Sequence, residues 1–170
     1  SKCHRTVVEN RMFYDADAMR CRLHTEAVAQ ETMRLLPVAP LQGAEPIEDT
    51  LIGDVLVPKG TPIYLLAGRA AKMAAAFSEP RAFNPQRWLS GGQHASAGHD
   101  PHAFFPFGGG PRVCPGRHLA LLEIKVVAAM LARNFEVTRP AGTLYPAEVF
   151  SFTMMPSSLS LLLRPRQRMH

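Results

Sequence analysis

The segment Phe107 to Gly116, with the sequence Phe-Gly-Gly-Gly-Pro-Arg-Val-Cys-Pro-Gly, constrains the fold of this chain more than any other feature. It holds one cysteine, Cys114, in a loop that contains four glycines and two prolines. Glycine permits positive φ and lets a flat ligand approach the main chain, whereas proline stiffens a loop. An apolar helical pattern over residues 116–133 begins directly after the cysteine. The chain must therefore present one thiol from a shaped loop at the start of a long helix.

The surroundings of Cys114 favour a cysteine that carries negative charge. Arg112 lies two residues before it, and a nearby permanent cation favours the thiolate over the thiol. The start of the following helix adds N–H groups and partial positive charge on the same side. We therefore expect Cys114 to bind a metal ion. The simpler alternative is a buried structural cysteine beside a Gly-Pro turn, since free cysteine often behaves as a small apolar core residue.

The pattern Phe107-x-x-Gly110-x-Arg112-x-Cys114-x-Gly116, followed by Ala120, resembles the haem-binding signature of the cytochrome P450 family of haem-thiolate monooxygenases. The resemblance implies that Cys114 is the proximal ligand to the iron of haem b, iron protoporphyrin IX. It also implies that Phe107 shields the thiolate from water and that Arg112 reaches a haem propionate. The implied cofactor-binding residues are Phe107, Gly110, Arg112, Cys114, Pro115, Gly116 and Ala120.

Two further segments match the same family in the same order along the chain. Glu31 and Arg34 stand three residues apart and so share a helix face, and Arg87 lies in the segment Phe-Asn-Pro-Gln-Arg-Trp. Alone, a Glu-x-x-Arg pair is usually a surface salt bridge worth less than about 1 kcal/mol. The resemblance implies instead that the three side chains form a buried charged cluster, in which forked hydrogen bonds hold the cysteine loop against the core. This charged cluster is expected to be structural, and no residue is assigned a catalytic role.

Segments that touch substrate in the family have two matches in this chain. One contains Val38 and Ala39, and the other contains Phe152 and Thr153 in a late hairpin. The chain departs from the family near residues 43–47, where many members carry a propionate-binding arginine and this sequence has Glu45. The distal helix that delivers protons has no counterpart in these residues. The resemblance therefore covers the C-terminal, haem-ligating part of the family fold, and the distal N-terminal part is expected to be missing.

Composition restricts the partners and the compartment. The net charge is +5 and the isoelectric point is about 9.5. Because no basic helix is interleaved with aromatic residues, we expect that the chain does not bind nucleic acid. Three cysteines without a CxxC spacing argue against a disulfide scaffold and structural zinc. We expect no membrane span in this chain, although the resemblance leaves room for an N-terminal anchor. The predicted location is the cytoplasm, and the arginine-rich, lysine-poor usage favours a bacterial source.

The hydrophobic pattern predicts an α+β protein, mainly helical, with small β-hairpins, in which residues 1–170 form part of one domain. We expect two helical pieces over residues 15–36 that meet at His24 and Thr25, with Asp15 or Asp17 and Thr25 as N-caps. The apolar positions of the helix over residues 116–133 predict burial on most sides. The remaining expected elements are a hairpin of residues 54–57 with 61–66, a short helix over 70–76, and strands at 135–137, 149–153 and 160–163.

The resemblance implies an O2-dependent hydroxylation of an apolar organic substrate, performed once the fold is complete. Electrons would come from NAD(P)H through a ferredoxin- or flavoprotein-type electron donor, whose acidic surface would meet arginines near the cysteine loop. Peroxide in place of oxygen is a variant that uses the same residues. Two other readings stay open: a stand-alone haem-binding or regulatory module, because Cys-Pro pairs also sense haem, and an inactive truncated remnant.

Overall fold

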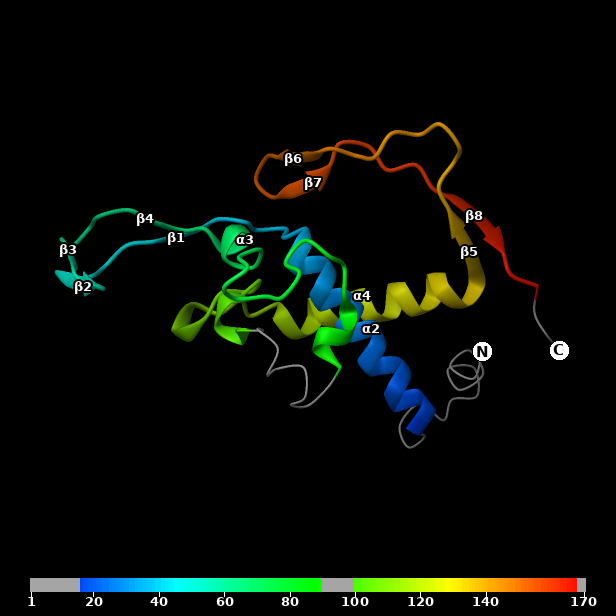
Figure 1. The fold of residues 1–170 in the computed structure, drawn as a ribbon, viewed down its shortest axis with the longest axis horizontal. Coiled ribbons are helices and arrows are strands. Elements are labelled where there is room, and N and C mark those ends of the chain that lie inside the picture. Colours follow the sequence, from blue (N-terminus) through cyan, green and yellow to red (C-terminus); the bar gives the residue numbers. More distant parts are fainter. Residues whose placement is uncertain (1–15, 90–99, 168–170) are drawn as a thin grey trace.

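The computed structural model describes residues 16–89 and 100–167 (Figure 1). Three α-helices, eight short strands and three 3-10 turns lie within these ranges. The helices are α2 (Ala16–Leu35), α3 (Ala67–Ala70) and α4 (Arg117–Asn134), and the 3-10 turns are η1 (Pro85–Trp88), η2 (Pro101–Ala103) and η3 (Gly110–Arg112). The strands are β1 (Gln42–Ala44), β2 (Thr50–Ile52), β3 (Val55–Val57), β4 (Ile63–Leu65), β5 (Phe135–Thr138), β6 (Glu148–Phe150), β7 (Met154–Pro156) and β8 (Leu162–Pro165).

Helices α2 and α4 pack against each other at the centre of the molecule (Figure 1). An ion pair of 3.1 Å between Lys125 Nζ on α4 and Glu26 Oε2 on α2 joins them. The described core lies where α2 meets α3, η1 and the segment between them. Its apolar residues are small except for one phenylalanine: Ala27, Ala29, Ala67, Ala71, Ala76 and Phe77.

Strands β1 to β4 form one long ribbon that projects from the helices, with β2 and β3 at its tip (Figure 1). The predicted hairpin between residues 54–57 and 61–66 is wrong, because β3 pairs antiparallel with β2 and β4 pairs with β1. Gly53 has φ +64°, which allows the tight turn that returns β3 along β2. The Pro-Lys-Gly segment instead makes a corner, where the Gly60 N–H donates to the Pro46 carbonyl at 3.0 Å.

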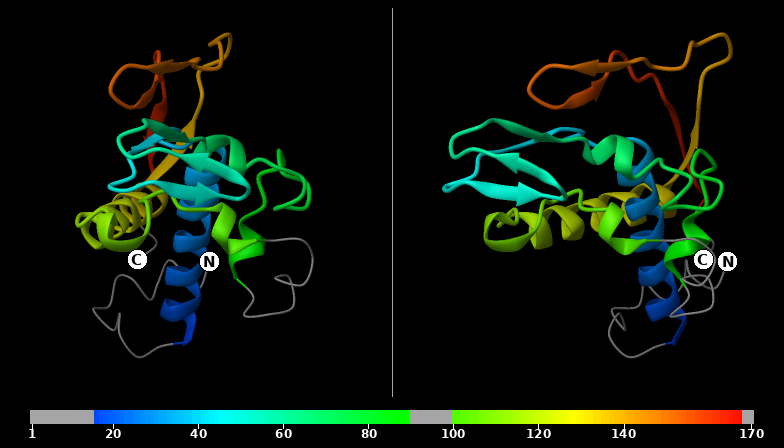
Figure 2. Two further views of the ribbon diagram at one scale, coloured as in Figure 1. Left: turned by 90° about the vertical axis from the view of Figure 1, so that its left-hand side faces the viewer. Right: turned by 60° about the vertical axis from the view of Figure 1, so that its left-hand side comes forward.

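The C-terminal part contains two antiparallel pairs, β5 with β8 directly after α4 and β6 with β7 (Figure 2). The strands predicted at 135–137 and 160–163 are present with shifted ends, as β5 and β8. The strand predicted at 149–153 is only partly right, because β6 ends at Phe150 and residues 151–153 form the turn to β7. The β6–β7 hairpin returns to the segment after α2, where the Met154 N–H donates to the Val38 carbonyl at 2.8 Å. The β6–β7 hairpin therefore contacts the loop that directly follows α2.

The N-terminal helical prediction needs correction. Helix α2 is continuous through His24 and Thr25, because no glycine or proline interrupts it before Pro37. Asp17 and Thr25 lie inside the helix and so are not N-caps, while Asp15 lies outside the described residues. The short helix expected at 70–76 begins and ends earlier, at Ala67–Ala70.

Helix α4 was predicted to be buried on most sides, and this is wrong for the described chain. None of its residues is buried. Leu119, Leu122, Val126 and Met130 are 49–60% exposed, and their spacing of three or four residues places them along one face of the helix. We call these four residues the α4 stripe. Neither α4 nor any other helix in the described ranges is long and apolar enough to cross a membrane.

Candidate functional site

The cysteine loop, Phe107 to Gly116, is shaped by two glycines and by its own backbone. Gly108 has φ +74° and Gly110 has φ +61°, values that residues with a Cβ rarely adopt. The Cys114 N–H donates to the Phe107 carbonyl at 2.9 Å, which closes the loop. The Arg117 N–H then donates to the Cys114 carbonyl at 3.2 Å, where α4 begins. The loop thus fixes the backbone of Cys114 on both sides.

The thiol of Cys114 is free and exposed. The main chain beside it is open as well, because a Cβ added at Gly109 or Gly110 would meet no atom within 4 Å. A Cβ added at Gly116 would lie 3.7 Å from the Cys114 sulfur, an ordinary contact distance. An accessible sulfur beside bare backbone leaves room for a large planar group to approach the thiol.

The other predicted cofactor-binding residues lie on the same loop and on the first turn of α4. Phe107 is half-buried, whereas Arg112 and Pro115 are exposed. Ala120 is half-buried on α4, and its N–H donates to the Gly116 carbonyl at 2.9 Å. The backbone therefore brings these side chains together at one end of α4, around Cys114.

Glu31, Arg34 and Arg87, the charged cluster, are buried and in contact. Arg34 forms a forked pair with Glu31, from Nε to Oε2 at 2.9 Å and from Nη2 to Oε1 at 2.8 Å. Arg87 Nε adds a contact of 3.2 Å to Glu31 Oε1, and the Asn84 N–H donates to the same oxygen at 2.9 Å. Glu31 thereby ties α2 to η1, two elements more than fifty residues apart in the sequence.

The arginines of the charged cluster also bind the chain between α3 and η1. Arg34 Nη1 donates to the carbonyls of Ala71 and Pro80, at 2.9 and 2.6 Å. Arg87 Nη1 donates to the Ser78 carbonyl at 3.1 Å, while its buried Nη2 has no acceptor among the described residues. The Arg34 guanidinium lies 5.1 Å from the centre of the Phe77 ring. Two buried cations therefore provide hydrogen-bond donors for backbone carbonyls of an irregular segment.

Trp88 belongs to this arrangement, although the sequence analysis gave it no role. Its indole Nε1 donates to Glu31 Oε2 at 2.9 Å, and its ring centre lies 4.8 Å from that of Phe104. Phe104 stands three residues before the cysteine loop. Trp88 thus connects the charged cluster to the segment that enters the loop. Its position next to Arg87 was the available signal.

The electrostatics of Glu31 follow from these contacts. Burial of the carboxyl raises its pKa, but hydrogen bonds from Arg34, Asn84 and Trp88, together with the charge of Arg34, outweigh burial and lower the pKa from 4.5 to about 2. Glu31 is therefore an anion at neutral pH. An anion that accepts several charge-assisted hydrogen bonds is suited to holding structure rather than to exchanging protons.

The two predicted substrate segments meet in the structure. The hydrogen bond from Met154 to Val38 places the turn of the β6–β7 hairpin beside the segment that contains Val38 and Ala39. Within the turn, the Ser151 N–H donates to the Thr153 carbonyl at 3.1 Å. Val38 is 57% exposed and Phe152 is 96% exposed. Both apolar side chains are therefore available to further atoms.

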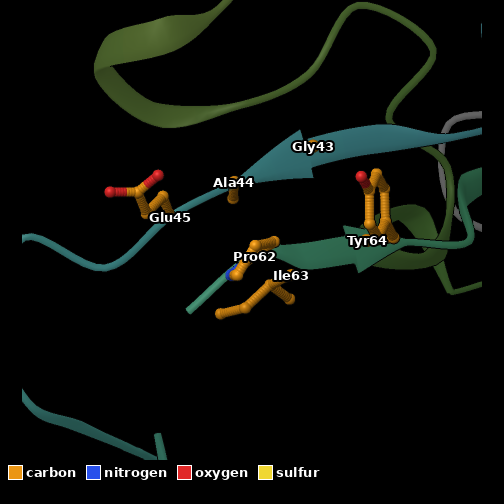
Figure 3. Close-up of a pocket in the computed structure, with 6 residues that line it drawn as sticks. All are labelled: Gly43, Ala44, Glu45, Pro62, Ile63 and Tyr64. Atoms are coloured by element: carbon orange, nitrogen blue, oxygen red, sulfur yellow. The ribbon is translucent and has the colours of Figure 1, made fainter. Parts of the chain in front are cut away.

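A shallow depression of about 310 Å³ lies elsewhere, on the β1–β4 ribbon. Its residues are Gly43, Ala44, Glu45, Pro62, Ile63 and Tyr64 (Figure 3). Glu45 stands at one end and the Tyr64 ring at the other. None of these residues belongs to the cysteine loop, so we do not assign the depression to the candidate site.

Comparison with known proteins identifies the family. The model of the family described as Cytochrome P450 matches residues 4–163 of this chain. The chain belongs to the cytochrome P450 family. The crystal structure of the heme domain of cytochrome P450DA has a TM-score of 0.75 and 27% identity, over 84% of this chain and 31% of that one. This likeness confirms the predicted fold class, a mainly helical α+β arrangement that corresponds to part of the P450 fold.

Three of the similar curated proteins come from two animals and a plant. The mitochondrial 25-hydroxyvitamin D-1 alpha hydroxylase of Rattus norvegicus is 37% identical over 82% of this chain and 27% of its own length. Probable cytochrome P450 4d20 of Drosophila melanogaster is 34% identical over 85% of the chain and 28% of its length. Beta-amyrin 28-monooxygenase of Vitis vinifera is 41% identical over 64% of the chain and 22% of its length. The chain thus spans about a quarter of the length of these relatives. Their animal and plant origins do not support the predicted bacterial source.

Proposed function

We propose that this chain supplies the haem-ligating part of a haem-thiolate monooxygenase, with Cys114 as the protein ligand to the iron. The observation that carries the proposal is the exposed Cys114 thiol on a loop whose backbone is held at both ends. The open main chain at Gly109 and Gly110 supports the approach of a flat macrocycle, since a Cβ added at either position would meet no atom within 4 Å. A single cysteine thiolate is one of the protein ligands that haem iron takes.

Each loop residue has a role in this proposal. Cys114 would bind the iron as a thiolate, and Phe107, which is half-buried on the same loop, would shield the bound sulfur from water. Arg112, which is exposed, pairs with a haem propionate. Pro115 has no N–H, so it leaves the sulfur one donor fewer and fixes the loop. When bound, haem b supplies the activation of O2 for hydroxylation of a C–H bond, with electrons from NAD(P)H.

The proposed substrate is an apolar organic molecule. Support comes from the exposed apolar side chains of Val38 and Phe152, on segments joined by the hydrogen bond from Met154 to Val38. Ala39 and Thr153 lie on the same two segments. The electron donor is proposed to be a ferredoxin or flavoprotein that meets the cationic surface around Arg117, which is exposed.

The α4 stripe supports the proposal that further polypeptide completes the domain. Four neighbouring apolar side chains that are about half-exposed are costly in water, and further apolar surface packed on them would remove that cost. We therefore place residues 1–170 within one P450 domain whose remaining part covers α4 and supplies the distal side of the haem pocket.

The test is the ferrous carbonyl spectrum of the protein expressed from its complete native coding sequence. A thiolate ligand moves the Soret band far to the red, so Cys114→Ser is expected to abolish this band while haem content is measured separately. Cys21→Ser is the matched control, because Cys21 lies on α2 outside the loop. Survival of the red-shifted band in Cys114→Ser, or its loss in Cys21→Ser alone, would overturn the assignment.

A further inference from the structure

Gln42 reaches from the β-ribbon to the segment that enters the cysteine loop. Its side-chain Nε2 donates to the Phe105 carbonyl at 3.0 Å, across 63 residues of sequence. The Gly108 N–H donates to the same carbonyl, also at 3.0 Å. Both lone pairs of the Phe105 carbonyl oxygen therefore accept a hydrogen bond. The bond from Gly108 closes the Phe105–Gly108 turn, and the bond from Gln42 attaches this turn to β1.

The amide of Gln42 also lies against the other end of this turn. A Cβ added at Gly108 would stand 3.5 Å from Gln42 Oε1, which is ordinary contact. Gly108 itself needs a glycine because its φ is +74°. The side chain of Gln42 thus spans the turn from Phe105 to Gly108.

The turn determines where Cys114 lies. Phe107 is inside the turn, and its carbonyl accepts the hydrogen bond of 2.9 Å from the Cys114 N–H. A change in the orientation of the Phe107 peptide would therefore move the Cys114 backbone with it. Gln42 is thus connected to Cys114 by its hydrogen bond to Phe105, by the Phe105–Gly108 turn, and by the hydrogen bond from Cys114 to Phe107.

The backbone of Gln42 is held in place by the pairing of β1 with β4. Gln42 pairs with Leu65 in the antiparallel register of β1 and β4. Just before β1, the Gly68 N–H donates to the Pro40 carbonyl at 3.0 Å. A Cβ at Gly68 would lie 3.0 Å from Pro40 Cβ and 3.1 Å from Pro37 Cγ, so helix α3 and this segment are in close contact.

We propose that Gln42 is a positioning residue for Cys114, acting through the Phe105–Gly108 turn. The inference rests on the proposed function for its chemical meaning, because a misplaced sulfur matters most when it binds iron. It adds a side chain on β1 to the support that the charged cluster gives through Trp88, whose ring contacts the neighbouring residue Phe104. The loop is then held from two independent parts of the fold.

The experiment compares Gln42→Met with the parent in protein expressed from its complete native coding sequence. Methionine keeps the length and removes the donor, and Gln42→Glu is a second variant of nearly the same shape that also lacks the donor. Gln86→Met is the matched control, since Gln86 is exposed on η1. The two readouts are amide hydrogen exchange of the peptide containing residues 105–116 in haem-free protein, and the fraction of ferrous carbonyl complex with the red-shifted Soret band.

We expect exchange in the loop to be roughly three- to tenfold faster in both Gln42 variants, the size of one lost hydrogen bond, and the red-shifted fraction to fall. Gln86→Met is expected to match the parent in both. Unchanged exchange and an unchanged spectrum in Gln42→Met would overturn the positioning role and leave the proposed function intact. Faster exchange in a protein that forms no thiolate–haem complex in any variant would retain the contact and refute the proposed function.

Discussion

The indole of Trp88 donates a hydrogen bond of 2.9 Å to Oε2 of Glu31, the carboxylate at the centre of the charged cluster. The other carboxylate oxygen receives Arg34, Arg87 and the Asn84 N–H. A neutral donor therefore completes the hydrogen bonding of a buried anion and, through its ring, contacts Phe104 at the entrance to the cysteine loop. The stability of the loop and of the charged cluster should be coupled.

Trp88→Phe is expected to lower the free energy of unfolding by about 1.5–3 kcal/mol, because it removes a hydrogen bond to a buried charge and keeps most of the ring contact. Urea denaturation of the complete protein measures the loss. Phe83→Leu is the control, since Phe83 is 55% exposed in the same segment and should change stability little. Equal stability of Trp88→Phe and the parent would show that the indole N–H is not needed.

Arg87→Ala should be more severe, at about 3–5 kcal/mol, because it leaves the buried Glu31 carboxylate with one guanidinium fewer. It also frees the Ser78 carbonyl. Arg81→Ala is the matched control, because Arg81 is exposed on the same stretch of chain and its loss should stay within about 0.5 kcal/mol. Thermal denaturation of both variants decides the matter, and similar melting temperatures would exclude the structural role of Arg87.

The pattern of apolar and charged residues was enough to locate both long helices, although it divided α2 in two and did not predict what surrounds them. Helix α4 could be read from its apolar run, since helical periodicity is local. Its exposure could not, because a run of apolar residues states only that a face should be covered, and the covering chain lies elsewhere. The pairing of β3 with β2 also escaped prediction, because Gly53 and Gly60 both permit turns and only the tertiary contacts of Gly60 with Pro46 make it a corner.

The cysteine loop shows a similar division. The motif predicted which residues gather around Cys114, because they are neighbours in sequence. The contacts of Gln42 and Trp88 join residues 63 and 57 positions apart. Neither residue lies in the cysteine motif, although Trp88 ends the segment that contains Arg87. Long-range support of a loop depends on how separate elements pack, which no local pattern encodes.

The low pKa of Glu31 predicts an acid-sensitive fold. The folded value of about 2 lies below the ordinary 4.5, so the stabilisation is complete above pH 4.5 and is lost as the pH falls towards 2. Its size is roughly 3 kcal/mol from the difference between the two values. A carbon-13 NMR titration of the Glu31 carboxyl should show little protonation above about pH 3. A midpoint for Glu31 near 4.5 would contradict the geometry.

The α4 stripe leads to a prediction that separates a covered helix from an exposed one. If further polypeptide packs on the stripe, Leu122→Ala should cost about 2–5 kcal/mol in the complete protein, as for a buried leucine. If Leu122 stays 56% exposed, as it is in this chain, Leu122→Ala should lower the free energy of unfolding by less than about 1 kcal/mol. Leu144→Ala is the control, because Leu144 is 91% exposed and lies away from the helix. A small loss at both positions would contradict the proposed cover over α4, while a large loss at Leu122 alone would place that cover on the helix that follows Cys114.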